Sequence, residues 1–131
     1  MNREMNSDIV TRDGQFPIVH ATGQGTVNGP TNDTRGFDSA TLVLQVSAIV
    51  AAGVVTYKLQ DGDAANMSDA ADVAAADLAG AFATLLQNTT QHVGYRGSKR
   101  YIRAVATYVS GTSVAHGASF VMAHASIRPA V

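Results

Sequence analysis

Alternation of apolar and polar residues in the middle of the chain constrains the fold more than any other feature. Residues 40–49 place apolar side chains at every second position, namely Leu42, Leu44, Val46 and Ala48. Residues 54–60 repeat this pattern with Val55, Tyr57 and Leu59. A period of two is typical of strands with one buried face. Ala51, Ala52 and Gly53 can turn the chain between them, so we expect the two strands to pair antiparallel.

Further strands are predicted along the rest of the chain, separated by turn residues. Residues 91–95, 99–109 and 113–126 are the main candidates, and a short strand is expected around Thr26. Residues 81–87 are compatible with a strand or a short helix, and we favour the strand. The alanine-rich residues 61–79 predict a connection with one or two helical turns at most. A series of about six to eight short strands predicts an all-β fold, an antiparallel β-sandwich or jelly roll.

The beginning of the chain is polar and lacks a helical period, so residues 1–20 are expected to form an extended N-terminal arm. Its apolar residues could attach the arm to a sheet, and Pro17 limits such a strand to an edge or to its start. The remaining residues, 21–131, are expected to form a single β-sandwich domain, since 131 residues suit one domain.

Composition excludes several classes of partner. Charged residues make up only 15% of the chain and the net charge is −1, so we expect no direct contact with nucleic acid. The chain has no cysteine, which excludes disulfides and thiolate metal sites. The apolar run at residues 48–55 is too short to cross a bilayer, and the N-terminus lacks the apolar run of a signal peptide. A surface with so little charge suits a protein that packs against other proteins.

No group of residues predicts catalysis, a cofactor or a metal site. The acidic stretch from Asp61 to Asp69 does not fit an EF-hand calcium loop, which requires a glycine at its sixth position and a glutamate at its twelfth. His116 and His124 lie about 26 Å apart on one predicted strand, too far to share a metal. His20 and His92 could meet through folding, although no pattern indicates it. No serine lies in a nucleophile elbow and the only glutamate is Glu4, so we expect no enzyme.

A basic run at the start of the predicted strand 99–109 is the best candidate for a contact with a partner. It consists of Arg96, Lys99, Arg100 and Arg103, of which Lys99 and Arg103 would share a strand face. The alternative is that the long stems of these side chains cover apolar neighbours while their charges reach water.

The same region carries a resemblance to a known family. Residues 93–103 read Val-Gly-Tyr-Arg-Gly-Ser-Lys-Arg-Tyr-Ile-Arg, and Gly94, Tyr95, Gly97 and Tyr101 mark a glycine-punctuated turn that leads into a strand. This run resembles a family of small structural proteins of tailed bacteriophages. Residues 39–44, 73–80, 119–123 and Arg128-Pro129 are similar to other recurrent pieces of that family. One departure is Gln60, at a position where relatives carry an acidic residue.

The resemblance implies a capsid decoration or cement protein that bridges and stabilises major capsid proteins against the pressure of the packaged DNA. Such a subunit is assembled in the host cytoplasm and lies on the surface of the virion. Its expected partners are the major capsid protein and further copies of itself. Apolar residues on both faces of strand 113–126 suggest a symmetric contact, such as that of a trimer. The alternatives are a head–tail connector, a tail-tube subunit or a glycan-binding virion module, the last disfavoured by the 6% aromatic content.

Overall fold

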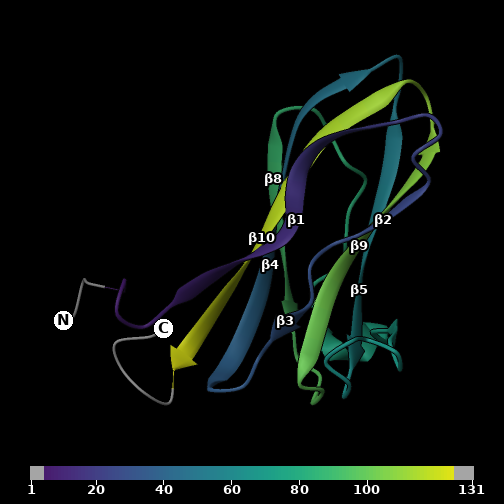
Figure 1. Ribbon diagram of the computed structural model, residues 1–131. Coiled ribbons are helices and arrows are strands. Elements are labelled where there is room, and N and C mark those ends of the chain that lie inside the picture. The colour runs from purple at the N-terminus through teal and green to yellow at the C-terminus, as the bar shows by residue number, and fades with distance from the viewer. Residues whose placement is uncertain (1–4, 126–131) are drawn as a thin grey trace.

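The computed structural model describes residues 5–125, with side chains up to His124, so the predicted Arg128-Pro129 ending lies outside the described residues. Two antiparallel sheets face each other, which confirms the predicted sandwich, while the jelly-roll order stays a prediction (Figure 1). Sheet A has the order β1 (Val10–Ala21), β10 (Ser113–Ala125), β4 (Phe37–Val50), β8 (Thr89–Tyr95) and β7 (Leu78–Ala79). Sheet B has the order β2 (Thr26–Asn28), β9 (Tyr101–Ser110), β5 (Val54–Gly62) and β6 (Ala71–Asp72), and β3 (Asn32–Asp33) also pairs with β9.

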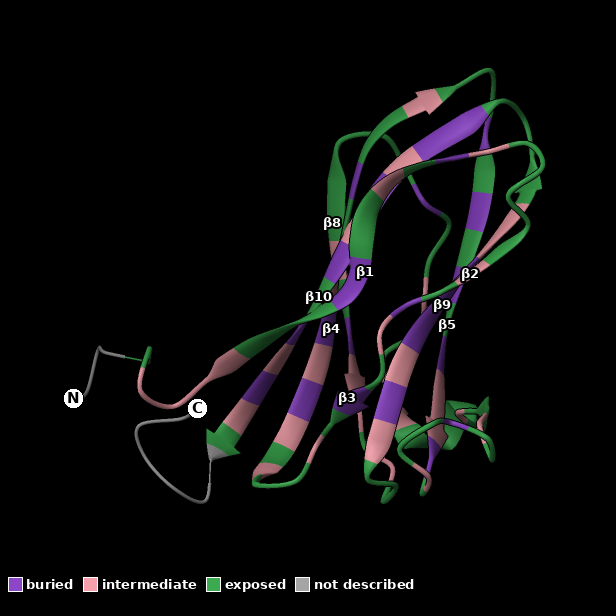
Figure 2. Cartoon of the chain, in the orientation of Figure 1, coloured by how far each residue is buried: buried purple, intermediate pink, exposed green. Residues whose placement is uncertain are grey.

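The hydrophobic core lies between the two sheets and is formed by the predicted inward faces. Figure 2 shows buried residues alternating with intermediate or exposed ones along the central strands. Leu42 and Leu44 of β4 and Phe120 of β10 have no exposed surface, and they pack with Val55 and Leu59 of β5. Each fully buried side chain of this size stabilises the fold by about 1.5–3 kcal/mol.

The predicted pairing of the two central stretches is wrong, because β4 and β5 belong to different sheets. Ala51 and Ala52 turn the chain from one sheet to the other, with φ angles of 50° and 55°. The turn is closed by a hydrogen bond from the Gly53 N–H to the Val50 carbonyl (3.2 Å). Alternation fixes which face of a strand is buried, but it does not identify the neighbouring strand.

The alternation in β4 also breaks at its end. The register with β10 moves from Val46 opposite His116 to Ile49 opposite Val114, so β4 carries one extra residue there. Such a bulge moves the following side chains to the other face of the sheet. Ala48, predicted to point inward, is therefore exposed, and Ile49 packs against the core instead.

Residues 81–87 form a loop and not the predicted strand. The Gln91 side chain holds the loop by accepting a hydrogen bond from Ala83 N–H (2.9 Å) and donating one to the Ala83 carbonyl (3.3 Å). Leu85 anchors the loop in the core. The preceding connection contains one 3₁₀ turn, η1 (Ala75–Asp77), within the predicted limit of one or two helical turns. None of the described residues forms a helix that could span a membrane.

The expected N-terminal arm is, from Val10 onward, part of the sandwich. Strand β1 forms the edge of sheet A and pairs with β10 from Val10 opposite Met122 to Ala21 opposite Ser113. Its register shifts between Asp13 and Gln15 and again between Gln15 and Ile18, a segment that includes Pro17. A proline is compatible with this position because the strand is an edge strand.

Candidate functional site

The glycine-punctuated turn forms a contact between the two sheets. Tyr95, at the end of β8 in sheet A, donates a hydrogen bond from its hydroxyl to Asp61 Oδ2 of β5 in sheet B (2.7 Å) and accepts one from the Lys99 N–H (3.1 Å). A Cβ atom at Gly97 would lie 2.4 to 2.6 Å from the Tyr95 ring and hydroxyl. Glycine at this position therefore lets the chain pass directly over the ring. Burial, followed by the bond to Asp61, raises the pKa of Tyr95.

Lys99 and Arg100 lie in the loop before β9, which begins at Tyr101. Arg100 donates two hydrogen bonds to Asp33, from Nε (2.9 Å) and Nη2 (2.8 Å), and its guanidinium lies 5.1 Å from the centre of the Tyr101 ring. The hydrogen bond from Arg100 lowers the pKa of Asp33. Lys99 Nζ pairs with Asp63 Oδ2 (2.7 Å), and this bond raises the pKa of Lys99. The two cations therefore contact different segments, since Asp33 belongs to β3 and Asp63 follows β5.

Arg103 lies on the outer face of sheet B in a row of polar side chains. Its Nε and Nη2 both donate to Gln60 Oε1 (3.0 and 2.7 Å). Gln60 in turn donates to Asp72 Oδ1 (3.0 Å), and Lys58 Nζ lies 3.0 Å from the same oxygen. Gln60, the departure from the family pattern, thus acts as a neutral acceptor for Arg103.

Arg96 differs from the other three members of the basic run. Its backbone N–H donates to the Asp77 carbonyl (2.7 Å), but its exposed side chain has no partner among the residues that the structure describes. The ion pairs of Lys99 and Arg100 are 42–65% exposed, so water screens them and each adds little to the stability of the fold. Such weak pairs can exchange their partners when another charged surface approaches.

The acidic stretch at the end of β5 continues into a loop that is held by hydrogen bonds between its own residues. The Asp69 carboxylate accepts hydrogen bonds from the N–H groups of Asp63 (2.8 Å) and Ala64 (3.2 Å), which lower the pKa of Asp69. Asp61 accepts a hydrogen bond from the Tyr95 hydroxyl, and Asp63 forms an ion pair with Lys99. Within residues 5–124 no group of three histidine or acidic side chains gathers at one point.

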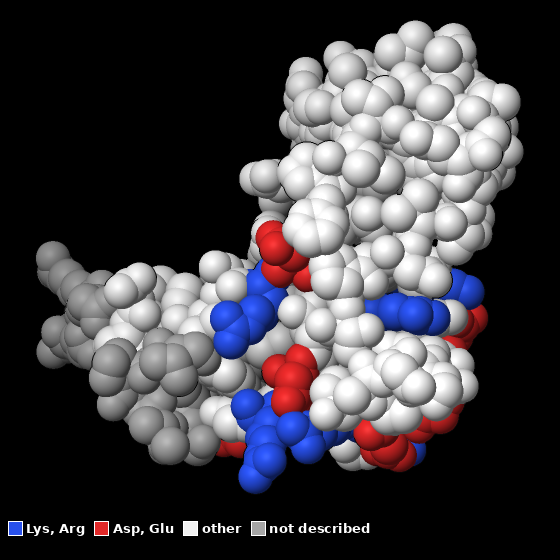
Figure 3. All heavy atoms as spheres, viewed as in Figure 1, with Lys and Arg blue, Asp and Glu red and all other residues white. Residues whose placement is uncertain are grey.

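We call the end of the sandwich that carries Asp33, Asp61, Arg96, Lys99 and Arg100 the charged end. At the opposite end, the sandwich forms a lobe without charged side chains. The antiparallel registers bring together the end of β1, the start of β10, the end of β4 and the start of β8, and likewise the start of β5 with the end of β9 and β2. We call this part the charge-free lobe; it consists of residues 15–28, 45–57, 82–90 and 104–118, none of which is Asp, Glu, Lys or Arg. On the face drawn in Figure 3, the upper part of the molecule shows no charged side chains, and the charged side chains in view lie below it.

The charge-free lobe exposes large apolar side chains. Seven such side chains are exposed among the described residues, and all but Met5 lie on the lobe: Phe16, Val19, Val50, Val54, Leu86 and Val109. Their exposed fractions range from 37% for Val54 to 62% for Val19. A cluster of exposed apolar groups on one side of a protein is typical of a contact surface.

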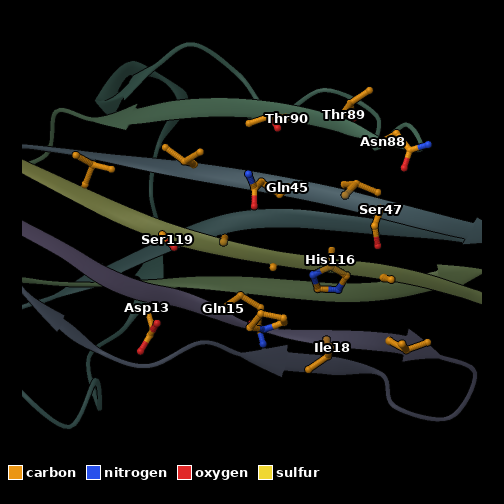
Figure 4. Close-up of a pocket in the computed structure, with 18 residues that line it drawn as sticks. Asp13, Gln15, Ile18, Gln45, Ser47, Asn88, Thr89, Thr90, His116 and Ser119 are labelled. Carbon is orange, nitrogen blue, oxygen red and sulfur yellow. The ribbon is translucent and has the colours of Figure 1, made fainter.

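The outer face of sheet A is hollowed by a trough of about 800 Å³ that crosses β1, β10, β4 and β8 (Figure 4). Most of its lining belongs to the charge-free lobe, but Asp13, Val43, Ser119 and Val121 lie outside the lobe. Small residues of β10 form part of the lining. Gly117 is one of them, and a Cβ atom there would lie 3.2 Å from Pro17. The other lining groups are amides, hydroxyls and aliphatic chains, with Asp13 as the one carboxylate and His116 as the one imidazole.

Beneath the trough, a chain of hydrogen bonds links the two sheets. His116 of β10 is 4% exposed and His20 of β1 is fully buried. His20 Nε2 lies 2.7 Å from the Gly25 carbonyl, His20 Nδ1 lies 3.1 Å from His116 Nε2, and His116 Nδ1 bonds the Tyr57 hydroxyl of β5. Because a carbonyl can only accept, His20 Nε2 carries a proton and its Nδ1 accepts one from His116. His116 Nδ1 then accepts from the Tyr57 hydroxyl, which completes the chain of hydrogen bonds.

Burial favours the neutral forms of His116 and Tyr57. Desolvation, with a smaller contribution from His20, lowers the pKa of His116 to about 4. Burial likewise raises the pKa of the Tyr57 hydroxyl. The arrangement satisfies the polar groups of His20, His116 and Tyr57, and it connects sheet A to sheet B.

Sequence patterns indicated the basic run, but they did not indicate the charge-free lobe, the trough or the contact between His20 and His116. The prediction that His20 might meet another histidine named His92, whereas its partner is His116, 96 residues away. The charge-free lobe did leave a signal in the sequence, since its four segments contain no charged residue.

Comparison of the chain with models of known protein families gave no match, and comparison with curated proteins gave none either.

Proposed function

We propose that the protein is a structural subunit of a tailed-bacteriophage virion, a decoration or cement subunit that bridges neighbouring major capsid proteins on the capsid surface. The observation that carries this proposal is the division of the surface into a charged end and a charge-free lobe with exposed apolar side chains. Two chemically different surfaces at opposite ends of a rigid block suit a subunit that contacts more than one neighbour. The resemblance of residues 93–103 supplies the class of assembly.

The charged end is the part that we assign to the shell. Arg96 has no partner among the described side chains, and the pairs of Lys99 and Arg100 are open to water. A complementary acidic surface on a shell protein can therefore engage all three without breaking a buried contact. Charged contacts of this kind set orientation and the rate of encounter more than the final affinity.

The mechanism follows from the pressure of packaged DNA, which pulls shell subunits apart. A subunit that spans the boundary between two shell proteins adds contact area where they would separate. One such contact buries on the order of 1,000 Å². Many modest contacts act together on one particle, so no single contact has to be strong.

The experiment compares phage particles prepared with and without this protein. We expect particles that lack it to release their DNA at a lower temperature, and addition of the purified protein to restore the release temperature. The variant Arg96→Glu should bind such particles more weakly, while Lys58→Glu, the same charge reversal on the outer face of sheet B, should bind normally. Equal DNA retention with and without the protein would contradict the proposal, and rings formed in solution without the shell would favour a tail-tube subunit.

A further inference from the structure

We propose that the charge-free lobe is a self-association surface, through which one copy of this chain binds a second copy. The inference goes beyond attachment to a capsid, because it concerns the purified protein alone. It rests on the exposed apolar side chains, the missing charges, the trough and the area of the lobe.

The exposed apolar side chains indicate that the lobe is covered in the assembled state. They come from four separate segments: β1, the turn between β4 and β5, the loop before β8, and the end of β9. The registers gather these segments at one end of the sandwich. The opposite end has the same architecture and carries the charged side chains. The apolar groups are therefore concentrated on one surface and are not spread over the chain.

The lack of charge favours a second copy as the partner. In a two-fold contact the same patch lies on both sides of the interface. A patch that contains Arg96 and Lys99 would bring like charges together, which is unfavourable. The charge-free lobe meets its own copy without repulsion, and no charge has to be removed from water.

The shape of the lobe fits the same partner. The trough on sheet A is lined in part by small residues of β10, and a volume of about 800 Å³ admits projecting apolar side chains. Leu86, 61% exposed at the tip of its loop, and Phe16, 55% exposed on β1, project from the lobe itself. Each copy thus offers both a hollow and projecting groups.

A self-association contact needs only a modest share of the surface. A stable interface of standard size takes about 800 Å² from each partner, whereas the whole chain exposes 7286 Å². The charge-free lobe contains 51 of the 131 residues and includes parts of both sheets.

The test is sedimentation of the purified protein over a roughly hundredfold range of concentration, since mass action favours the oligomer at the upper end. We expect reversible association of the unmodified protein. Val19→Glu and Leu86→Glu, on two separate elements, should each weaken association by about tenfold or more, because each buries an unpaired charge in the contact. Met5→Glu is the matched control, since Met5 is as exposed as Val19, at 62%, but lies outside the lobe. Circular dichroism and cooperative unfolding show that each variant is folded.

Salt provides a second, independent measurement. Association through the charge-free lobe should persist or strengthen when the salt concentration is raised, because ions screen charged contacts and sulfate favours apolar burial. A protein that stays monomeric at every concentration would overturn the inference. Association that weakens with salt, or that Met5→Glu disrupts as much as the lobe variants do, would also overturn it. These outcomes leave capsid binding untouched, so a failure here is distinct from a failure of the proposed function.

Discussion

The charged end and the charge-free lobe both join sheet A to sheet B, but they do so with different chemistry. At the charged end, Tyr95 reaches across to the carboxylate of Asp61, and exposed ion pairs surround the contact. In the lobe, Tyr57 reaches across to His116 within a buried chain of hydrogen bonds. The difference shows how burial selects the partner: a carboxylate is tolerated where water can reach it, whereas a buried contact requires neutral groups.

The largest expected effect is a loss of stability in weak acid that originates in the lobe. His116 has a pKa of about 4 in the folded protein, against an ordinary value of 6.5. Between these values the unfolded chain binds more protons than the folded chain, so stability falls as the pH is lowered from 6.5 toward 4. The full loss is about 3 kcal/mol. Chemical unfolding at a series of pH values measures it.

The same titration separates the two ends of the molecule. The pKa values of Asp33 and Asp72, which are paired outside the lobe, lie below the ordinary 3.8, so their contribution is lost only in stronger acid. His116→Gln should remove the pH dependence between 6.5 and 4, and His92→Gln, at an exposed position, should leave it intact. A wild-type stability that is flat over this interval would show that the lobe does not hold a neutral imidazole.

Tyr57→Phe tests whether the hydroxyl between the sheets matters for stability. The change leaves His116 Nδ1 buried without a donor, and an unsatisfied buried group costs about 1–3 kcal/mol. We expect the free energy of unfolding to fall by about that amount. Tyr101→Phe is the matched control, since the described residues offer its half-exposed hydroxyl no hydrogen-bond partner, and it should change stability little. Equal losses in the two variants would mean that the bond to His116 contributes nothing.

Gly97→Ala tests the corresponding contact at the charged end. The added methyl group would lie within 2.6 Å of the Tyr95 ring, so the ring has to move away from Asp61. Overpacking of this kind costs about 1–3 kcal/mol, and we expect the lower half of that range because Tyr95 is only half-buried. Thermal unfolding measures the loss.

A double-mutant cycle tests whether the Tyr95 ring is the cause of the stability loss in Gly97→Ala. If the ring is the obstacle, Gly97→Ala should cost little when Tyr95 is already replaced by Ala, and the coupling between the two changes should reach about 0.5 kcal/mol or more. Additive losses would assign the glycine to backbone conformation instead.

The sequence patterns predicted which face of a strand is buried better than they predicted which strand lies beside it. Alternation identified the inward sides of β5 and most of β4, because burial of one sheet face imposes a period of two on the residues themselves. It failed at Ala48, where a bulge reverses the phase without any change in composition. It also paired β4 with β5, because a short turn between two strands is equally compatible with a hairpin and with a crossing between sheets.

The candidate sites show the same contrast between features that are local in the sequence and features that depend on strand pairing. The basic run was visible because its residues are close in sequence, although the structure distributes Lys99, Arg100 and Arg103 among different partners. His20 meets His116 only because β1 pairs with β10 in a register that shifts twice between Asp13 and Ile18. No local pattern fixes that register. The charge-free segments can be recognised in the sequence, but their union in one lobe depends on the strand order.

The smallest expected effect concerns the ion pair between Arg100 and Asp33, and it tests how far the charged end is held by its charges. Asp33→Asn keeps the shape of the side chain and removes its charge. Both partners are more than 40% exposed, so we expect a loss of only about 0.2–1 kcal/mol at low salt. The difference from the unmodified protein should vanish in about 1 M salt, where the screening length is about 3 Å. Tyr57→Phe should keep its full effect in the same salt, because the lobe contains no charge to screen. A salt-independent loss for Asp33→Asn would mean that its carboxylate acts through hydrogen-bond geometry alone, and the contrast between the two ends would then lie in burial and not in charge.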